Sequence, residues 1–221
     1  MRAGEGSCKK ETHMYLHVEQ PVATLVAPGS DEDLALRLAM ASPWDTTRGL
    51  FLRTTLDAVS CLGSESAVRD CQRAGGEEKL LDFFLYPVTT HLRMVFSAAH
   101  MLAERCGGLD AALRALGYRC ADSFLGSAAG MTLQLLANGD VTRLVDRLPM
   151  AYRAAANFGT RSLVWMGPRQ GRLTMCHEFM PYPFHEGMLL GVLDKAQARG
   201  ARVQGQQLST LESEYELSWE S

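Results

Sequence analysis

The feature that most constrains the fold of this chain is a change in the spacing of its apolar residues near Thr160. Before Gly159, apolar residues recur every three or four positions, which is the spacing of helices that bury one face. After it, apolar and polar residues alternate, which is the pattern of strands that bury one face. The sequence therefore predicts a helical first two-thirds followed by strands, an order typical of the α+β class.

Caps and helix-breaking residues divide the first part of the chain. Helices are predicted at residues 31–40, 45–62, 65–74, 87–107, 109–137 and 141–158. The fifth is either one helix or two joined at Gly117, and Pro149 kinks or restarts the sixth. A β-branched run at residues 22–26 predicts a short strand before the first helix.

The second part begins with a hairpin, in which residues 161–180 fold around a turn at residues 167–171. The residues predicted to share one face of its second strand are Leu173, Met175, His177 and Phe179. A helix that starts at His185 and two further strands follow. The order strand–strand–helix–strand–strand predicts an antiparallel sheet of about four strands, on which the helical first two-thirds of the chain packs.

The chain shows no internal repeat and no break in composition. Its 221 residues are enough to bury roughly 70% of the surface of the unfolded chain. With 47% hydrophobic and 21% charged residues, the composition excludes a disordered protein. We therefore predict a flexible leader at residues 1–20 and a single α+β domain at residues 21–221.

Charge and cysteine usage exclude several classes of partner. The chain has 22 lysines and arginines against 25 acidic residues, so it lacks the basic field that a nucleic-acid-binding protein needs. It has no run of eighteen apolar residues, which predicts no membrane span. Its six cysteines include no Cys-x-x-Cys pair and predict reduced thiols in a cytoplasmic protein.

Several short strings, in a fixed order, resemble a family of uncharacterised proteins, a domain of unknown function present in many copies in myxobacterial genomes. The resemblance covers about residues 20–220. The strings are "TTRGLFLRTTLDAV", "FFLYPVTTHLRMVFSAA", "GGLDAALRALGYR", "GDVTRLVDRLPMAYRAAANFGTRSLVW", "EFMPYPFHEGML" and "ESEYELSW".

The predicted order of elements is similar to a fold shared by haem-based nitric-oxide sensors, vinyl-reductase-type ligand-binding domains and transport-particle subunits of the Golgi. This resemblance implies either a ligand-binding module or a homodimeric adaptor, because a fold alone does not fix a function. The haem-binding branch carries Tyr-x-Ser-x-Arg to hold the haem propionates. Here the nearest string is Tyr215-Glu-Leu-Ser218-Trp219, whose spacing differs and which lacks the arginine, and this counts against a haem pocket of that type.

Aromatic and sulfur-containing side chains gather in the hairpin and in the corner that follows it. They either form core or line an apolar pocket between sheet and helices, where methionines adapt to ligands of irregular shape. The candidate ligand-binding residues are Trp165, Met175, His177, Phe179, Tyr182, Phe184 and His185.

Each of the two histidines in this set could have a structural role instead of binding a ligand. His177 lies among apolar residues, so it either finds a hydrogen-bond partner in the core or faces a ligand. His185 falls at a helix N-cap or first turn, where it sets the turn or offers a ring nitrogen to a ligand.

We predict no metal site and no catalytic residue. His91 and His100 lie on opposite edges of one apolar helix stripe, while Cys176 and His177 point to opposite faces of one strand. Gly-x-Ser-x-Gly, a phosphate-binding loop and His-Glu-x-x-His do not occur, and no cofactor is identified.

Two hypotheses from different classes follow, and an enzyme of an unrecognised type stands behind them as a third. In the first, the chain is a cytoplasmic, non-enzymatic module that holds a small apolar or cofactor-like ligand and signals through protein contacts. In the second, it is a ligand-free homodimeric adaptor related to transport-particle subunits.

Overall fold

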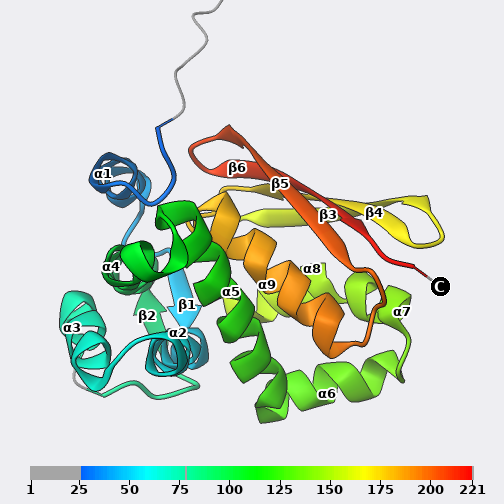
Figure 1. Ribbon diagram of the computed structural model, residues 1–221, viewed down its shortest axis with the longest axis horizontal. Coiled ribbons are helices and arrows are strands. Elements are labelled where there is room, and N and C mark those ends of the chain that lie inside the picture. Colours follow the sequence, from blue (N-terminus) through cyan, green and yellow to red (C-terminus); the bar gives the residue numbers. More distant parts are fainter. Residues whose placement is uncertain (1–25, 78, 221) are drawn as a thin grey trace, which may run out of the picture.

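A computed structural model describes residues 26–77 and 79–220 (Figure 1). The predicted leader and residues 22–25 of the predicted first strand lie outside these ranges. The described elements of the first part are α1 (Asp31–Met40), β1 (Thr46–Arg48), α2 (Gly49–Leu62), α3 (Glu65–Gly75), β2 (Leu85–Pro87), α4 (Val88–Cys106), α5 (Leu109–Gly126), α6 (Ala128–Ala137), α7 (Val141–Asp146) and α8 (Leu148–Ala155). Those of the second part are β3 (Thr160–Gly167), β4 (Gln170–Cys176), α9 (Tyr182–Lys195), β5 (Arg202–Ser209) and β6 (Glu212–Ser218). The predicted α+β class is confirmed.

Local side-chain caps explain where several helices begin. The hydroxyl of Ser30 accepts a hydrogen bond from the Asp33 backbone N–H at the start of α1, and Ser64 does the same for Ala67 in α3. Such caps satisfy backbone donors that have no partner within the helix. The helix ends follow the sequence equally closely, since Gly107 after α4 has a left-handed φ of 89°.

In the first part of the chain, the start of α2 and the break after α5 differ from the prediction. Residues Thr46–Arg48 form β1, which pairs antiparallel with β2, so α2 begins only at Gly49. The long helix breaks at Ser127, whose hydroxyl caps α6, and not at Gly117. Gly117 is instead a helical residue of α5. A glycine is needed at this position because α5 and α9 pack backbone against backbone there, and a Cβ would overlap the carbonyl oxygen of Phe184.

The second part forms a four-stranded antiparallel sheet in the order β3-β4-β6-β5. Its inner face carries Leu173, Met175 and Leu217, which pack with Leu189 of α9 in one apolar cluster. Its other face is polar, and Arg172 pairs with Glu216 at 2.8 Å across neighbouring strands. The sheet is therefore covered on one face, as the alternation predicts.

The corner between β4 and α9 departs from the predicted pattern. His177 does not continue the face of Leu173 and Met175, because β4 ends at Cys176 and His177 has a left-handed φ of 55°. Its side chain is half-exposed. The helix starts at Tyr182, three residues before the predicted start, with Pro181 at its N-cap.

Helices α5 and α9 run side by side between the sheet and α2–α4 (Figure 1). α6 turns away from the end of α5, and α8 returns the chain to β3. None of the helices in the described part of the chain is long and apolar enough to cross a bilayer.

Candidate ligand-binding site

A groove with a volume of about 580 Å³ opens between α2, α6 and α8. Most of the side chains that line it are apolar, and they come from four separate segments of the chain. They are Arg48, Leu50 and Phe51; Asp82 and Phe83; Phe124, Ser127, Ala128, Ala129, Thr132, Leu133 and Leu136; and Met150, Ala151, Ala154 and Ala155. Both volume and lining are typical of sites that hold small apolar molecules.

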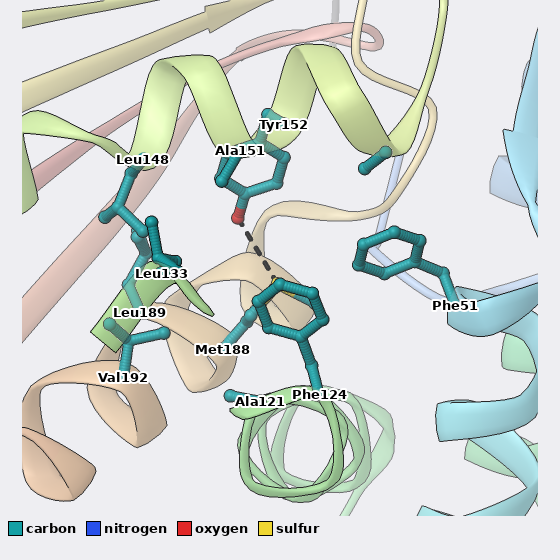
Figure 2. Close-up of a pocket in the computed structure, with 11 residues that line it drawn as sticks. Phe51, Ala121, Phe124, Leu133, Leu148, Ala151, Tyr152, Met188, Leu189 and Val192 are labelled. Carbon is teal, nitrogen blue, oxygen red and sulfur yellow. Dashed lines mark hydrogen bonds between the residues drawn. The ribbon is translucent and has the colours of Figure 1, made fainter. Parts of the chain in front are cut away.

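A smaller apolar pocket, of about 30 Å³, adjoins the inner end of the groove (Figure 2). Phe51 and Phe124, whose ring centroids are 5.3 Å apart, line both spaces. Tyr152 of α8 and Met188 of α9 also line the pocket, and Figure 2 shows the Tyr152 hydroxyl directed at the sulfur of Met188. The space therefore narrows from a wide mouth to an inner end at α9.

Small side chains create this space. Ala128 and Ala129 open α6, and Ala151, Ala154 and Ala155 form one side of α8. Because alanine extends little beyond the backbone, neighbouring helices leave a gap where alanines face each other. The break at Ser127 directs α6 away from α5 (Figure 1).

Tyr152 connects the inner pocket to α9. Its hydroxyl lies 3.1 Å from Nδ1 of His185 and donates to the sulfur of Met188 at 3.3 Å. Burial, reinforced by the nearby charge of Glu178, raises the pKa of Tyr152 above its ordinary value. The hydroxyl is therefore neutral at pH 7 and acts as a hydrogen-bond donor.

A buried ionic cluster lies behind Tyr152. Arg161 of β3 forms a short ion pair with Glu178, and these side chains are only 1% and 3% exposed. Nε2 of His185 lies 3.3 Å from Oε1 of the same carboxylate, which also accepts a hydrogen bond from the Met180 backbone N–H. Burial alone would raise the pKa of Glu178, but the attraction of His185 and Arg161 holds it well below its usual range.

A second buried pair ties α1 to the same corner. Nε of Arg37 lies 2.7 Å from Oδ1 of Asp33, and Nη1 of Arg37 donates to the carbonyl oxygen of Phe179 at 3.0 Å. The loop that follows β4 is thus held by ion pairs and hydrogen bonds from α1, β3 and α9.

The seven residues predicted from the sequence do not gather around one cavity. Met175 packs under the sheet, whereas Phe179 and Phe184 belong to the core among the helices. Trp165 contacts Trp219 and donates to Asp146, Tyr182 is partly buried, and His177 is half-exposed against Phe179. None of the seven residues lines the groove. His185 comes nearest to it through its hydrogen bond to Tyr152, which lines the inner pocket.

Sequence reasoning missed the residues that carry the site. Alanines in α6 and α8 bear no chemical signature, and Tyr152 is not among the candidate residues predicted from the sequence. One usable signal is the pair Glu178 and Arg161, because charged residues in an otherwise apolar corner require partners when they are buried.

His91 of α4 occupies a separate buried position. Its Nε2 lies 2.9 Å from the hydroxyl of Thr55, and burial lowers the pKa of His91 to about 4, since the neutral ring is favoured away from water.

This shift predicts a loss of stability in mild acid. A histidine with a pKa near 6.5 in the unfolded chain and about 4 in the folded one stabilises the fold above pH 6.5 and loses that contribution as the pH falls towards 4. The loss amounts to about 3 kcal/mol. We expect urea unfolding of His91→Gln between pH 7 and 4 to show a shallower fall in unfolding free energy than the wild type. His100→Gln, on the exposed side of the same helix, should follow the wild type; parallel curves for all three would contradict this.

Solved structures of H-NOX proteins are similar to this chain. The Fe(II) unliganded H-NOX protein of K. algicida has a TM-score of 0.55 at 12% identity, with 79% of this chain and 97% of that chain covered. The Fe(II)NO form of the S. oneidensis protein has a TM-score of 0.57 at 12% identity, with coverage of 79% and 99%. A Cs H-NOX mutant has a TM-score of 0.60 at 9% identity, with coverage of 79% and 97%.

The chain is thus an α+β protein with an H-NOX-like fold. It belongs to the family described as "Protein of unknown function (DUF2378)", whose model matches residues 41–220. No curated protein matches it in sequence.

One similar structure concerns the redox potential of haem, but the residues of this groove do not fit a haem. Haem iron takes an axial ligand such as histidine, cysteine, methionine or tyrosine. The lining residues include no histidine or cysteine. The methionine of the groove, Met150, is 47% exposed, and at the inner end the hydroxyl of Tyr152 is hydrogen-bonded to the sulfur of Met188. The inner pocket, at about 30 Å³, is far too small for a porphyrin. Within the described ranges no cluster of three metal-binding side chains occurs.

Proposed function

We propose that this protein is a non-enzymatic binding module that holds a small apolar ligand in the groove between α2, α6 and α8. The observation that carries the proposal is the apolar space itself, about 580 Å³, which narrows into an apolar pocket. This volume lies within the range of roughly 300–1,000 Å³ that is usual for small-molecule binding sites.

Apolar side chains at the mouth of the groove support the proposal. Phe83 is 85% exposed, and Leu136 and Met150 are also exposed while lining the groove. Covering such side chains with an apolar molecule removes them from water, which favours binding.

The polar groups of the groove support a binding role over a catalytic one. The hydroxyl of Ser127 donates to the Phe124 carbonyl oxygen and accepts from the Gly130 backbone N–H. The hydroxyl of Thr132 donates to the Ala128 carbonyl oxygen. Both hydroxyls are therefore engaged by the backbone, and neither is paired with a base that would activate it.

Tyr152 is the proposed route by which occupancy reaches the rest of the protein. A ligand that fills the inner pocket contacts Tyr152, whose hydroxyl forms hydrogen bonds with His185 and Met188 of α9. His185 in turn faces the carboxylate of Glu178 at the corner of the sheet. Of the residues predicted from the sequence, His185 keeps a role in this proposal, acting through Tyr152.

We propose a cytoplasmic location for the module, and the free thiols of its described cysteines support this proposal. Two of them are buried, and burial raises the pKa of Cys71 and of Cys120 to about 12. Such thiols are protonated and unreactive at neutral pH.

The substitution Ala129→Trp tests the groove. Ala129 is exposed on α6 and lines the groove, so a tryptophan there fills the space without disturbing the core. We expect calorimetric titration with 1-decanol to show binding to the wild type and a loss of at least about tenfold in affinity for Ala129→Trp. Met131→Trp, an exposed change on the same helix outside the groove lining, should bind like the wild type.

The same titration separates the two hypotheses. Failure of the wild type to bind 1-decanol, together with a solution mass of twice one chain, would favour the ligand-free homodimeric adaptor. The exposed side chains of Phe83, Phe84 and Leu85 are the observation in favour of that alternative, because exposed apolar patches often mark protein–protein contacts.

A further inference from the structure

The mouth of the groove has one cation whose charge is not matched by a neighbouring acid. Asp82 is paired with Arg53 at 2.7 Å, so that its charge is compensated. Arg48 also lines the groove, yet within residues 26–77 and 79–220 no carboxylate oxygen lies within ion-pair distance of it. The mouth therefore has a local excess of positive charge in a protein whose net charge is −3.

Arg48 is held in place from two sides. Its backbone belongs to β1 and pairs with Leu85 of β2. Its side-chain Nε donates to the carbonyl oxygen of Ala154, which lies in α8 across the groove, at 2.7 Å. This contact fixes the guanidinium at the mouth and leaves the two Nη groups for another acceptor. Two parallel N–H groups match the two oxygens of a carboxylate.

The shape of the space restricts what is attached to that carboxylate. Between Arg48 and the inner pocket, the lining is apolar. It includes Leu133, Leu136 and Ala151 and, beside them, the rings of Phe51 and Phe124. The inner end, at about 30 Å³, admits the end of a chain and no ring. One narrow end and one unmatched cation fit a ligand with a single chain and a single negative charge.

We infer that the ligand of the groove is an unbranched aliphatic carboxylate, with its carboxylate on Arg48 and its chain directed towards Tyr152. This inference rests on the proposed function and adds the chemical class of the ligand. A molecule with two chains does not fit, because the inner pocket takes only one chain. A doubly charged head group does not fit either, because Arg48 compensates only one negative charge.

Calorimetric titration of the full chain with decanoate and with 1-decanol tests this inference. The two probes share the same chain length and differ in the head group. For Arg48→Met we expect decanoate to bind about three- to tenfold more weakly, a range that reflects the exposure of the arginine, while the affinity for 1-decanol changes by less than about twofold. Added salt should weaken decanoate binding to the wild type and leave 1-decanol binding unchanged.

Arg69→Met is the matched control, since Arg69 is an exposed arginine of α3 outside the groove. It should bind both probes like the wild type. If Arg48→Met leaves decanoate binding unchanged while 1-decanol still binds the wild type, the carboxylate inference is overturned and the proposed function stands. If neither probe binds the wild type, the proposed function fails and the inference fails with it. Retained binding of 1-decanol by Arg48→Met also shows that the variant is folded.

Discussion

Glu178→Ala should lower the free energy of unfolding by about 3–5 kcal/mol, measured by urea denaturation at pH 7. The variant leaves Arg161 with its charge buried and without the carboxylate it pairs with. It also removes the acceptor of the Met180 backbone N–H and the carboxylate that His185 faces. An unpaired buried charge is far more costly than the loss of the pair as a unit.

Two further variants identify the cause of this loss. Glu216→Ala breaks an ion pair with Arg172 whose side chains are 49% and 42% exposed, and it should cost less than about 1 kcal/mol. The double variant Glu178→Leu with Arg161→Met removes both charges and should lose less stability than Glu178→Ala alone. Equal losses for Glu178→Ala and Glu216→Ala would show that the corner does not depend on its buried charge.

Gly117→Ala should destabilise the protein by about 3 kcal/mol or more. The new Cβ would overlap the carbonyl oxygen of Phe184, which is backbone and cannot rotate away as a side chain can. Relief requires α5 and α9 to move apart, and this separates the apolar cores on their two sides.

Gly126→Ala provides the matched control for that change. It lies at the end of the same helix, and a Cβ there meets no atom within 4 Å. Because alanine has the higher helix propensity, this variant should be neutral or more stable by up to about 1 kcal/mol. Thermal unfolding of the two variants gives the comparison; similar melting temperatures would mean that the helices are not in backbone contact at Gly117.

Much of the fold is predictable because it depends on periodicity over long stretches. The helices from α1 to α5 and the four-stranded sheet extend over enough residues for a period of 3.6 or 2 to stand out. The short strands β1 and β2 have three residues each, which is too few to show a period. The predicted start of α2, at residue 45, therefore lies before its actual start at Gly49. The left-handed turn at His177 could not be predicted from the pattern either, since residues other than glycine seldom adopt that conformation.

The site was harder to predict than the fold, for a physical reason. Its walls come from residues 48–51, 82–83, 124–136 and 150–155, which only the tertiary fold brings together. Small side chains such as the alanines of α6 and α8 leave this space open. The predicted ligand-binding residues, in contrast, are mostly large aromatic and sulfur-containing ones such as Phe179 and Phe184. The structure places these two in the core.

Nuclear magnetic resonance titration of the methyl-labelled protein with 1-decanol locates the ligand directly. We predict that the methyl signals of Ala129, Met150 and Ala151 shift as the alcohol is added, and that those of Met175, beneath the sheet, stay in place. Shifts at Met175 with unchanged signals for the three groove residues would contradict a binding site between α2, α6 and α8.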